Sequence, residues 1–264
     1  MTRDAAQGQG RVRLAVEDGL ATLVFDRPEA RNAMTWTMYE QLGAHCERLA
    51  GTPGIRVGLL RGAGGEAFVA GTDIHQFLDF EGGADGVAYE ARIDAGIARI
   101  EQLPFPTIAV VEGWAVGGGL AIATACDFRV ATPNAKFGVP IARTLGNMLS
   151  PLNMARLRQA WGHQNVRRML LLAQILDADD ALACGFLNEV AAIDALDETV
   201  GQLVRRLRAL APVTQWASKE ALRRLTVANV PAMDDLIEAC YGSDDFKEGV
   251  RAFAERRAPA WRGR

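Results

Sequence analysis

The chain has 264 residues and a mass of 28.5 kDa; 49% of its residues are hydrophobic and 23% are charged, as is typical of a globular domain. It carries 29 Lys and Arg against 32 Asp and Glu, a net charge of −3, so no basic excess favours binding to nucleic acid. With only three histidines and three serines, it has few ways to pair a nucleophile with a base. Any catalysis is therefore expected to depend more on the backbone than on such side chains.

The cysteines lie far apart and form no CxxC pair, which gives no support for a zinc site. They are Cys46, Cys126, Cys184 and Cys240. No apolar run reaches the roughly 18 residues of a membrane span, and the first ten residues lack the apolar core of a secretory signal. We therefore expect no metal site, no membrane association and a cytoplasmic location.

The first half of the chain predicts strands and helices in succession. Residues 1–11 are expected to form a flexible leader. Apolar and polar residues alternate over 12–16, and an apolar run at 20–25 follows a turn, which predicts a β-hairpin. Apolar residues at helical spacing predict a helix from Thr35 or Thr37 to about residue 49, because either threonine suits an N-cap. The elements expected next are a strand at 57–60, a helix at 87–102, a strand at 108–111, a short helix to about 125 and a strand at 128–131.

The second half predicts mostly helices. Strand–strand–helix units followed by a helical region indicate a mixed α/β architecture. A short apolar stretch at 186–191 interrupts the helices. The expected helices lie near 151–160, 164–173, 178–184, 194–210, 212–226, 231–240 and 243–256.

Two glycine-rich segments follow predicted strands. GAGGEA (62–67) matches a degenerate dinucleotide fingerprint, but FVAG (68–71) does not resemble the helix start that the fingerprint requires, so a turn is favoured. GWAVGGGL (113–120) lies where a strand passes into a helix. Free N–H groups at such a helix start are able to hold an anion or a developing oxyanion. The alternative is that the glycines only permit tight strand–helix packing.

Six segments together resemble the crotonase superfamily, also called the enoyl-CoA hydratase/isomerase family. They are DRPEARNAM (26–34), AFVAGTDI (67–74), VEGWAVGGG (111–119), ACDFRVA (125–131), AKFG (135–138) and FKEGVRAF (246–253). Their order and spacing extend the resemblance over nearly the whole chain, from about residue 12 to 257.

The resemblance implies an α/β fold: a crotonase-type spiral of ββα turns followed by a C-terminal helical oligomerisation region. The acyl-CoA-binding spiral core is expected over 12–200 and the helical trimerisation region over 201–264. Family members form homotrimers, often paired into hexamers, so the partners implied are an acyl-CoA substrate and further copies of the chain. Coenzyme A enters as part of the thioester substrate, and no separately bound cofactor is implied.

The resemblance also assigns residues to the site. The backbone N–H groups of Thr72 and Gly118 match the two donors of the family's oxyanion hole. Because these donors are amides, Thr72→Ala is expected to be mild in itself. The residues that match the CoA-binding segments are Arg27 and Ala30 (phosphates and adenosine), Ala70, Asp73 and Ile74 (pantetheine), and Phe253 and Arg256 (CoA of a neighbouring subunit). Arg27 is alternatively an ordinary surface arginine, and Phe253 is alternatively a core residue.

The sequence departs from the family at the two glutamates with which enoyl-CoA hydratases move protons. The matching positions hold Ala121 and Ile141, and neither side chain is able to transfer a proton. Arg143 and Asn147 are candidate replacements, since an arginine binds carboxylates and an asparagine holds a water or a polar group. Alternatively, both only satisfy local carbonyls at a helix start. Other polar residues near the site are left unranked: His75, Glu112, Tyr89 and Glu90, while Asp73 is expected to fix its loop.

These observations favour an acyl-CoA enzyme that stabilises a thioester enolate and catalyses isomerisation, lyase or decarboxylase chemistry, or hydration with an unusual acid–base set. A catalytically degenerate acyl-CoA-binding protein is the alternative. The serine peptidases that share the spiral fold are disfavoured, because the nearest serine downstream of the glycines is Ser150.

Overall fold

Two antiparallel strands open the part of the chain that the computed structural model describes, residues 10–263. β1 (Arg11–Glu17) pairs with β2 (Leu20–Asp26), which confirms the predicted hairpin. Alternate residues of β2 are buried, as expected for a strand with one face on the core. All but the last two residues of the expected leader lie outside the described residues.

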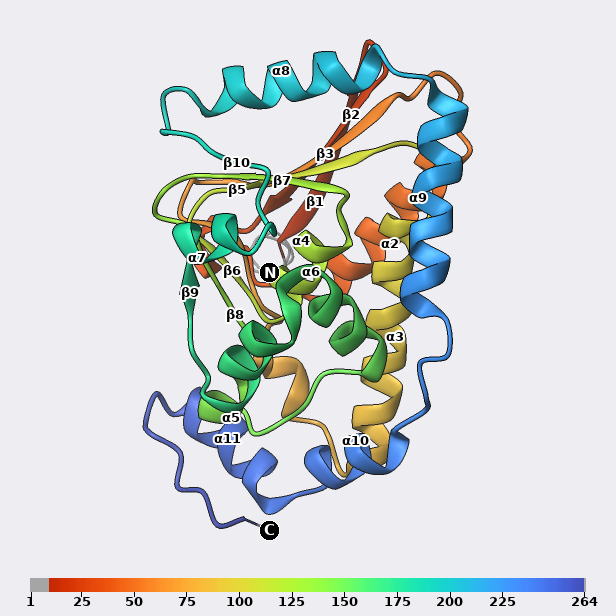
Figure 1. The fold of residues 1–264 in the computed structure, drawn as a ribbon. Coiled ribbons are helices and arrows are strands. Elements are labelled where there is room, and N and C mark those ends of the chain that lie inside the picture. Colours follow the sequence, from red (N-terminus) through yellow and green to blue (C-terminus); the bar gives the residue numbers. More distant parts are fainter. Residues whose placement is uncertain (1–9, 264) are drawn as a thin grey trace, which may run out of the picture.

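Three pairs of strands follow, and the members of each pair join different sheets (Figure 1). The pairs are β3 (Val57–Gly62) with β4 (Ala67–Ala70), β5 (Thr107–Val111) with β6 (Trp114–Val116), and β7 (Phe128–Ala131) with β8 (Lys136–Gly138). The six-stranded sheet has the order β1-β2-β3-β5-β7-β10 and the four-stranded sheet the order β4-β6-β8-β9, where β9 is Leu176–Asp177 and β10 is Glu189–Val190. Apart from the β1–β2 and β8–β9 pairs, neighbouring strands are parallel. Each turn therefore contributes one strand to each sheet, as in a spiral of ββα units.

Helices connect and cover these turns. The side chain of Thr35 caps α2 by accepting a hydrogen bond from the Met38 amide, so the earlier of the two predicted caps is used. The helices expected at 151–160 and 164–173 are one element, kinked at Gly162, where φ is +74°. The remaining helices of the spiral are short or close to their predicted bounds. They are η1 (Pro28–Ala30), α2 (Trp36–Ala50), η2 (Ile74–Phe77), α3 (Gly83–Glu101), α4 (Gly118–Ala125), α5 (Ile141–Thr144), α6 (Pro151–Leu171) and α7 (Ala178–Ala183).

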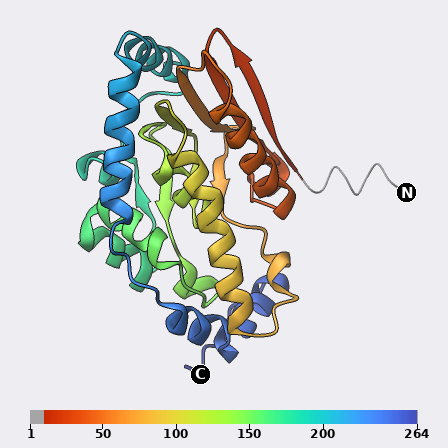
Figure 2. The ribbon, with the colours of Figure 1, turned by 90° about the vertical axis from the view of Figure 1, so that its right-hand side faces the viewer.

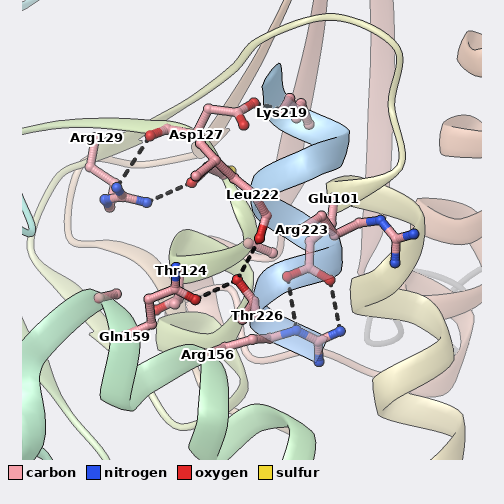
Figure 3. A pocket seen from close by; sticks show the side chains of 13 residues that line it. Glu101, Thr124, Asp127, Arg129, Arg156, Gln159, Lys219, Leu222, Arg223 and Thr226 are labelled. Carbon is pink, nitrogen blue, oxygen red and sulfur yellow. Dashed lines mark hydrogen bonds and ion pairs between the residues drawn. The ribbon is translucent and has the colours of Figure 1, made fainter. Parts of the chain in front are cut away.

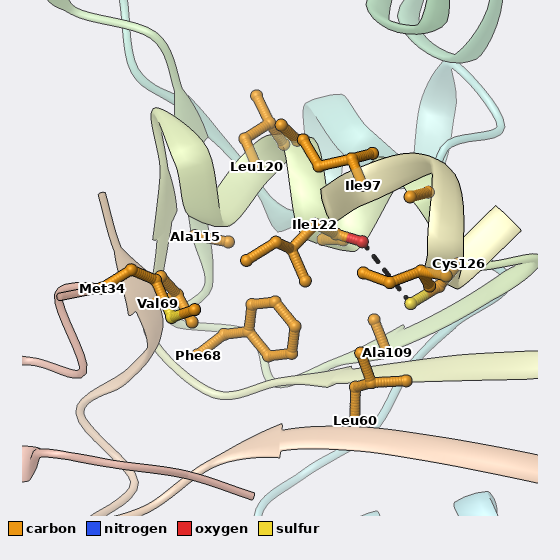
Figure 4. Close-up of a cluster of buried hydrophobic side chains, with 14 of the residues drawn as sticks. Met34, Leu60, Phe68, Val69, Ile97, Ala109, Ala115, Leu120, Ile122 and Cys126 are labelled. Carbon is orange, nitrogen blue, oxygen red and sulfur yellow. Dashed lines mark hydrogen bonds between the residues drawn. The ribbon is translucent and has the colours of Figure 1, made fainter. Parts of the chain in front are cut away.

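The main core lies between the sheets and helices α2, α3 and α4 (Figure 4). Phe68 and Ile122 are fully buried, and Phe25 packs edge-on against Phe68 with ring centroids 5.3 Å apart. A second cluster forms where α8 (Leu196–Arg208) packs on the outer face of the six-stranded sheet. Burial of these side chains fixes the strand ends on which the glycine-rich loops lie.

Four helices complete the chain: α8, α9 (Pro212–Val227), α10 (Asp234–Tyr241) and α11 (Asp244–Ala254). α8 lies at one end of the molecule, α10 and α11 lie at the other, and α9 runs along the side between them (Figures 1 and 2). α10 packs against α3 and α11 against η2, so the last two helices border the segment that follows β4. The boundary expected at residue 200 falls inside α8.

Within residues 10–263, no helix combines the length and apolar character needed to cross a bilayer. Over the same part of the chain, no three His, Cys, Asp or Glu side chains are grouped as metal ligands.

Candidate active site

The two glycine-containing loops meet because the strands that precede them are neighbours. β4 and β6 are parallel, and Ala70 lies opposite Val116 in their register. The next residues are therefore brought side by side: a Cβ built on Gly117 would lie 3.7 Å from the Cα of Gly71. Both glycines have positive φ, +92° at Gly71 and +53° at Gly117, a conformation that residues with a Cβ rarely adopt.

This meeting brings the amides of Thr72 and Gly118 to one place. Gly118 is the first residue of α4, so its N–H has no acceptor within the helix. The Thr72 N–H, likewise, has no acceptor among the described residues. The Thr72 hydroxyl lies 3.3 Å from a Cβ built on Gly118, which shows how closely the two residues approach. Both residues line one cavity, which is compatible with the backbone donors of an oxyanion hole that the sequence predicts here.

A cavity of ≈190 Å³ opens in front of these amides. Ala121 and Ile141 both line it, so the positions of the two absent glutamates do face the site. Its wall is mostly apolar and is completed by residues from η2, α3 and α11. The predicted site residues on this wall are Thr72, Gly118, Asn147, Ala70, Ile74 and Phe253.

One carboxyl group lies on the cavity wall, that of Glu90 on α3. Its side chain is 3% exposed, and each oxygen accepts one hydrogen bond: Oε1 from the Tyr241 hydroxyl at 2.7 Å and Oε2 from the Ser150 amide at 2.7 Å. Burial raises the pKa of Glu90 to about 7, with help from the charge of Asp94 and against the effect of the two hydrogen bonds. A carboxyl with this pKa is able both to give and to take a proton near neutrality.

Asn147 extends this hydrogen-bonded group. Its Nδ2 donates to the Tyr241 hydroxyl at 3.0 Å, while its buried Oδ1 has no partner. Tyr241 lies on α10, so the C-terminal helices hold the carboxyl that faces the cavity. Asn147 was a candidate from sequence, whereas Tyr241 was not.

The remaining predicted site residues lie away from the cavity wall. Arg143 is exposed and is not among the lining residues, so the structure does not bring it to the amides. Ala30 is half-buried in η1, and Arg256 is exposed just beyond α11. Their assignment to CoA binding stays a prediction, as does contact of Phe253 with a neighbouring subunit; in this chain Phe253 lines the chain's own cavity.

Arg27 and Asp73 form an ion pair with an N–O distance of 2.8 Å beside the oxyanion loop. Asp73 also accepts hydrogen bonds from the backbone and ring of His75, and so caps η2. Burial opposes ionisation of Asp73, but the bonds from His75 and Arg27 outweigh it and lower the pKa of this carboxyl. Asp73 thus fixes its loop, as expected.

A second cavity of ≈230 Å³ lies between α4, α6 and α9 and is rich in charged side chains (Figure 3). Four cationic side chains and two carboxylates line it, and each cation has a partner within the protein. Arg223 pairs with Glu220 at 2.7 Å, and Arg129 donates to the backbone carbonyls of Phe186 and Cys126. Lys219 pairs with Asp127 at 2.7 Å, and Arg156 pairs with Glu101 at 2.8 Å. Because these cations already have partners within the protein, the cavity lined by Thr72 and Gly118 is the candidate active site.

Comparison with known proteins shows the family to which the chain is related. A model of the enoyl-CoA hydratase/isomerase family matches residues 15–264. The chain is 32% identical over 259 residues to the (E)-benzylidenesuccinyl-CoA hydratase of Thauera aromatica, covering 96% of this chain and 99% of that protein. It is 30% identical over 261 residues to the carnitinyl-CoA dehydratase of Proteus mirabilis, covering 96% and 98% of the two chains. A solved structure of methylmalonyl-CoA decarboxylase with 2-nitronate-propionyl-CoA is 28% identical and superimposes with a TM-score of 0.88 over 96% of this chain and 99% of that one.

The chain belongs to the enoyl-CoA hydratase/isomerase family. The crotonase fold expected from the six sequence segments is therefore confirmed. Members of this family act on CoA thioesters in several ways, since its relatives here include a hydratase, a dehydratase and a decarboxylase.

Three residues on or beside the candidate site could not be assigned to it from the sequence. Glu90 was one of several polar candidates, and only its burial distinguishes it. Tyr39 and Tyr241 occupy apolar positions of helices, where an aromatic ring alone explains the pattern. Their hydroxyl groups gain significance only from partners distant in sequence, such as Thr72 for Tyr39.

Proposed function

We propose that this protein binds an acyl-CoA thioester and stabilises its enolate with the amides of Thr72 and Gly118. The observation that carries the proposal is that Thr72 and Gly118, whose amides have no acceptor among the described residues, lie close together on the wall of a single cavity. An enolate places negative charge on the thioester oxygen, and fixed N–H donors stabilise that charge without reorganisation. The CoA moiety would extend past the ion pair of Arg27 and Asp73, in line with the CoA-binding segment that the sequence predicts.

Within this proposal, Glu90 is the group that moves the proton. Glu90 supplies one carboxyl group, whereas a hydratase of the ordinary type uses two glutamates. The positions of those two glutamates hold Ala121 and Ile141, whose side chains have no ionisable group. A single acid–base group suffices to shift a proton between two carbons, or to protonate an enolate after a carbon–carbon bond breaks. We therefore favour isomerase or lyase/decarboxylase chemistry over ordinary crotonyl-CoA hydration.

The test is a panel of enoyl-, 3-hydroxyacyl- and carboxyacyl-CoA thioesters with detection of products by mass. Turnover of one of them should fall steeply in Glu90→Gln and persist in Glu112→Gln, whose carboxylate pairs with Arg61 away from the cavity. Rapid hydration of crotonyl-CoA that survives Glu90→Gln would contradict the assigned reaction class.

The substitution of both hydratase glutamates also supports a second candidate, an acyl-CoA-binding protein without catalysis. The two functions differ in the effect of Gly118→Pro. If the wild type turns over any acyl-CoA thioester and Gly118→Pro abolishes that turnover, the second candidate is excluded.

We also propose that the chain assembles as a homotrimer, singly or paired into a hexamer. No residue of α9 is buried, and large apolar side chains on it are exposed. Beside it, an apolar groove of ≈430 Å³ runs between α6 and α9 and includes Leu171 and Leu225, which are 74% exposed. A second copy of the chain is the partner that family membership suggests for this surface.

A further inference from the structure

Three hydroxyl groups form a chain beside the two amides. Tyr39 of α2 lies 2.9 Å from the Thr72 Oγ1, and Tyr89 of α3 lies 3.0 Å from the same atom. The Tyr39 hydroxyl is 2.6 Å from a Cβ built on Gly118, and the Thr72 hydroxyl is 3.3 Å from it. The hydroxyl chain therefore borders the space between the proposed oxyanion donors.

The three hydroxyl groups carry one more O–H hydrogen than the number of hydrogen bonds between them. Burial raises the pKa of Tyr39 to about 12 and that of Tyr89 well above its usual value, so both phenols keep their protons. Three hydroxyl groups carry three hydrogens, and the two contacts with Thr72 use two of them. None of the three oxygens has another hydrogen-bond partner among residues 10–263. One O–H is left over, and an unpaired buried donor is unfavourable unless a ligand accepts from it.

The position of the spare hydrogen follows from which of the three residues line the cavity. Tyr39 does not line it, so Thr72 is the acceptor within the reach of its hydroxyl. Its hydrogen is therefore spent on Thr72. The spare hydrogen then belongs to Thr72 or to Tyr89, and both of these residues line the cavity.

We propose that this spare hydroxyl hydrogen is a third donor to the thioester oxygen, beside the amides of Thr72 and Gly118. The inference rests on the proposed function, because it needs an acyl-CoA in the cavity. The thioester oxygen is the acceptor that the geometry favours, since Thr72 supplies both an oxyanion amide and the central hydroxyl.

The first measurement is the thioester carbonyl stretch of bound butyryl-CoA labelled with ¹³C at the carbonyl carbon, recorded by isotope-edited infrared spectroscopy. In the wild type, donors should move the stretch below its value in water. The double variant Thr72→Val/Tyr89→Phe removes both cavity-facing hydroxyls, and the stretch should rise while the amides remain. Tyr39→Phe deletes the same kind of phenol O–H but leaves a free hydrogen at the wall, so its stretch should stay close to that of the wild type.

Kinetics supply the second measurement. The double variant should lose about 100-fold in kcat on the substrate found in the panel, as on removal of an oxyanion donor, with little change in butyryl-CoA affinity. Tyr89→Phe alone should lose much less, because the Thr72 hydrogen is then free to point into the cavity. If the double variant folds poorly, 3-fluorotyrosine at position 89 replaces it; a more acidic phenol should lower the stretch further.

The outcomes separate the two levels of inference. A double variant that binds butyryl-CoA with a wild-type stretch, or an unmoved stretch with 3-fluorotyrosine, overturns the third donor and leaves the proposed function standing. A wild-type protein that does not bind butyryl-CoA, or binds it without lowering the stretch, overturns the oxyanion hole itself and the third donor with it.

Discussion

At the level of single residues, two substitutions of Gly118 separate the contribution of its N–H to kcat from the effect of adding a side chain at this position. Gly118→Pro removes the amide hydrogen at the first position of α4, where a helix tolerates proline. We expect kcat to fall about 100- to 1000-fold, as for loss of an oxyanion donor, while the circular dichroism spectrum remains that of the folded protein.

Gly118→Ala is the matched control. It keeps the N–H but places a Cβ 2.6 Å from the Tyr39 hydroxyl, the movable end of a side chain. Its loss should be smaller than that of proline. Equal losses in the two variants would assign the effect to crowding and contradict an oxyanion role for the amide.

A second prediction at the level of residues concerns the contribution of Glu90 to the pH dependence of the free energy of unfolding. Its pKa is about 7 in the folded chain, against an unfolded value near 4.5, so the folded state binds more protons between these values. Its contribution is fully present below pH 4.5 and is lost as the pH rises through 7, a change of about 3 kcal/mol. Glu90→Gln should remove this part of the pH dependence in urea unfolding at pH 5 to 8. Glu112→Gln should keep it, and an unchanged slope in Glu90→Gln would count against a buried carboxyl that titrates near 7.

The unpartnered Asn147 Oδ1 has a physical explanation in the same group of residues. With Glu90 ionised, Tyr241 donates to the carboxylate and accepts from Asn147, which leaves Oδ1 without a donor. With Glu90 protonated, the carboxyl is able to donate to Tyr241, and Tyr241 to the amide oxygen after a flip of Asn147. Glutamine at position 90 would imitate the second arrangement, which makes it a suitable replacement.

The sequence indicated the backbone part of this candidate site more directly than its side chains. Thr72 and Gly118 were assigned from the resemblance of local motifs, and the structure places both on one cavity, while their oxyanion role stays a prediction. Glu90 could not be ranked, because its pKa depends on burial and on Tyr241, which is 151 residues away. Thr72 was treated as an amide alone, since nothing local indicates that Tyr39 and Tyr89 meet at its hydroxyl.

At the level of elements, periodicity predicted long helices and missed short strands. Helices α2, α8 and α9 lie within a few residues of their expected bounds, because each repeats its apolar pattern over several turns. Strands β6 and β8 have only three residues each and show no alternation that a sequence pattern can register. They are nevertheless decisive, since β6 pairs with β4 and so places Gly118 beside Thr72.

Helix α10 carries the prediction at this level. Tyr241→Phe keeps the ring that packs against Phe80 and Phe246 but removes the hydroxyl that donates to Glu90. Because that hydrogen bond favours the ionised carboxyl, its loss should raise the pKa of Glu90 further. The acidic limb of the kcat/KM profile should move to higher pH by about one unit or more, given the worth of a hydrogen bond to a charged group.

Asn147→Leu serves as the graded control, since it removes a partner of Tyr241 without touching Glu90. The acidic limb of the kcat/KM profile of Asn147→Leu should move less than that of Tyr241→Phe. A profile that does not move in Tyr241→Phe would mean that α10 has no electrostatic part in the reaction.

At the level of the whole molecule, the C-terminal helices divide between two tasks. Phe253 of α11 lines the cavity of its own chain, and Tyr241 of α10 donates to Glu90 on the wall of that cavity. α9 instead lies along the side with no buried residue and contacts the spiral mainly through polar groups such as Lys219. A helix that leaves large apolar side chains in water is better explained by a partner than by the fold of one chain.

The groove between α6 and α9 therefore provides the last prediction. Light scattering after gel filtration should give a mass of three or six times 28.5 kDa for the wild type.

Leu171→Glu/Leu225→Glu places two charges on this groove, and burying them at an interface is costly, so the trimer should dissociate to smaller species. Val16→Glu charges an exposed apolar residue on β1, outside the groove, and should leave the mass unchanged. A wild-type monomer would refute the assembly, and an intact trimer in the double variant would move its interface away from α9. Because Thr72, Gly118 and Tyr89 line the cavity of one chain, the dissociated variant should keep its infrared carbonyl shift even where its stability falls.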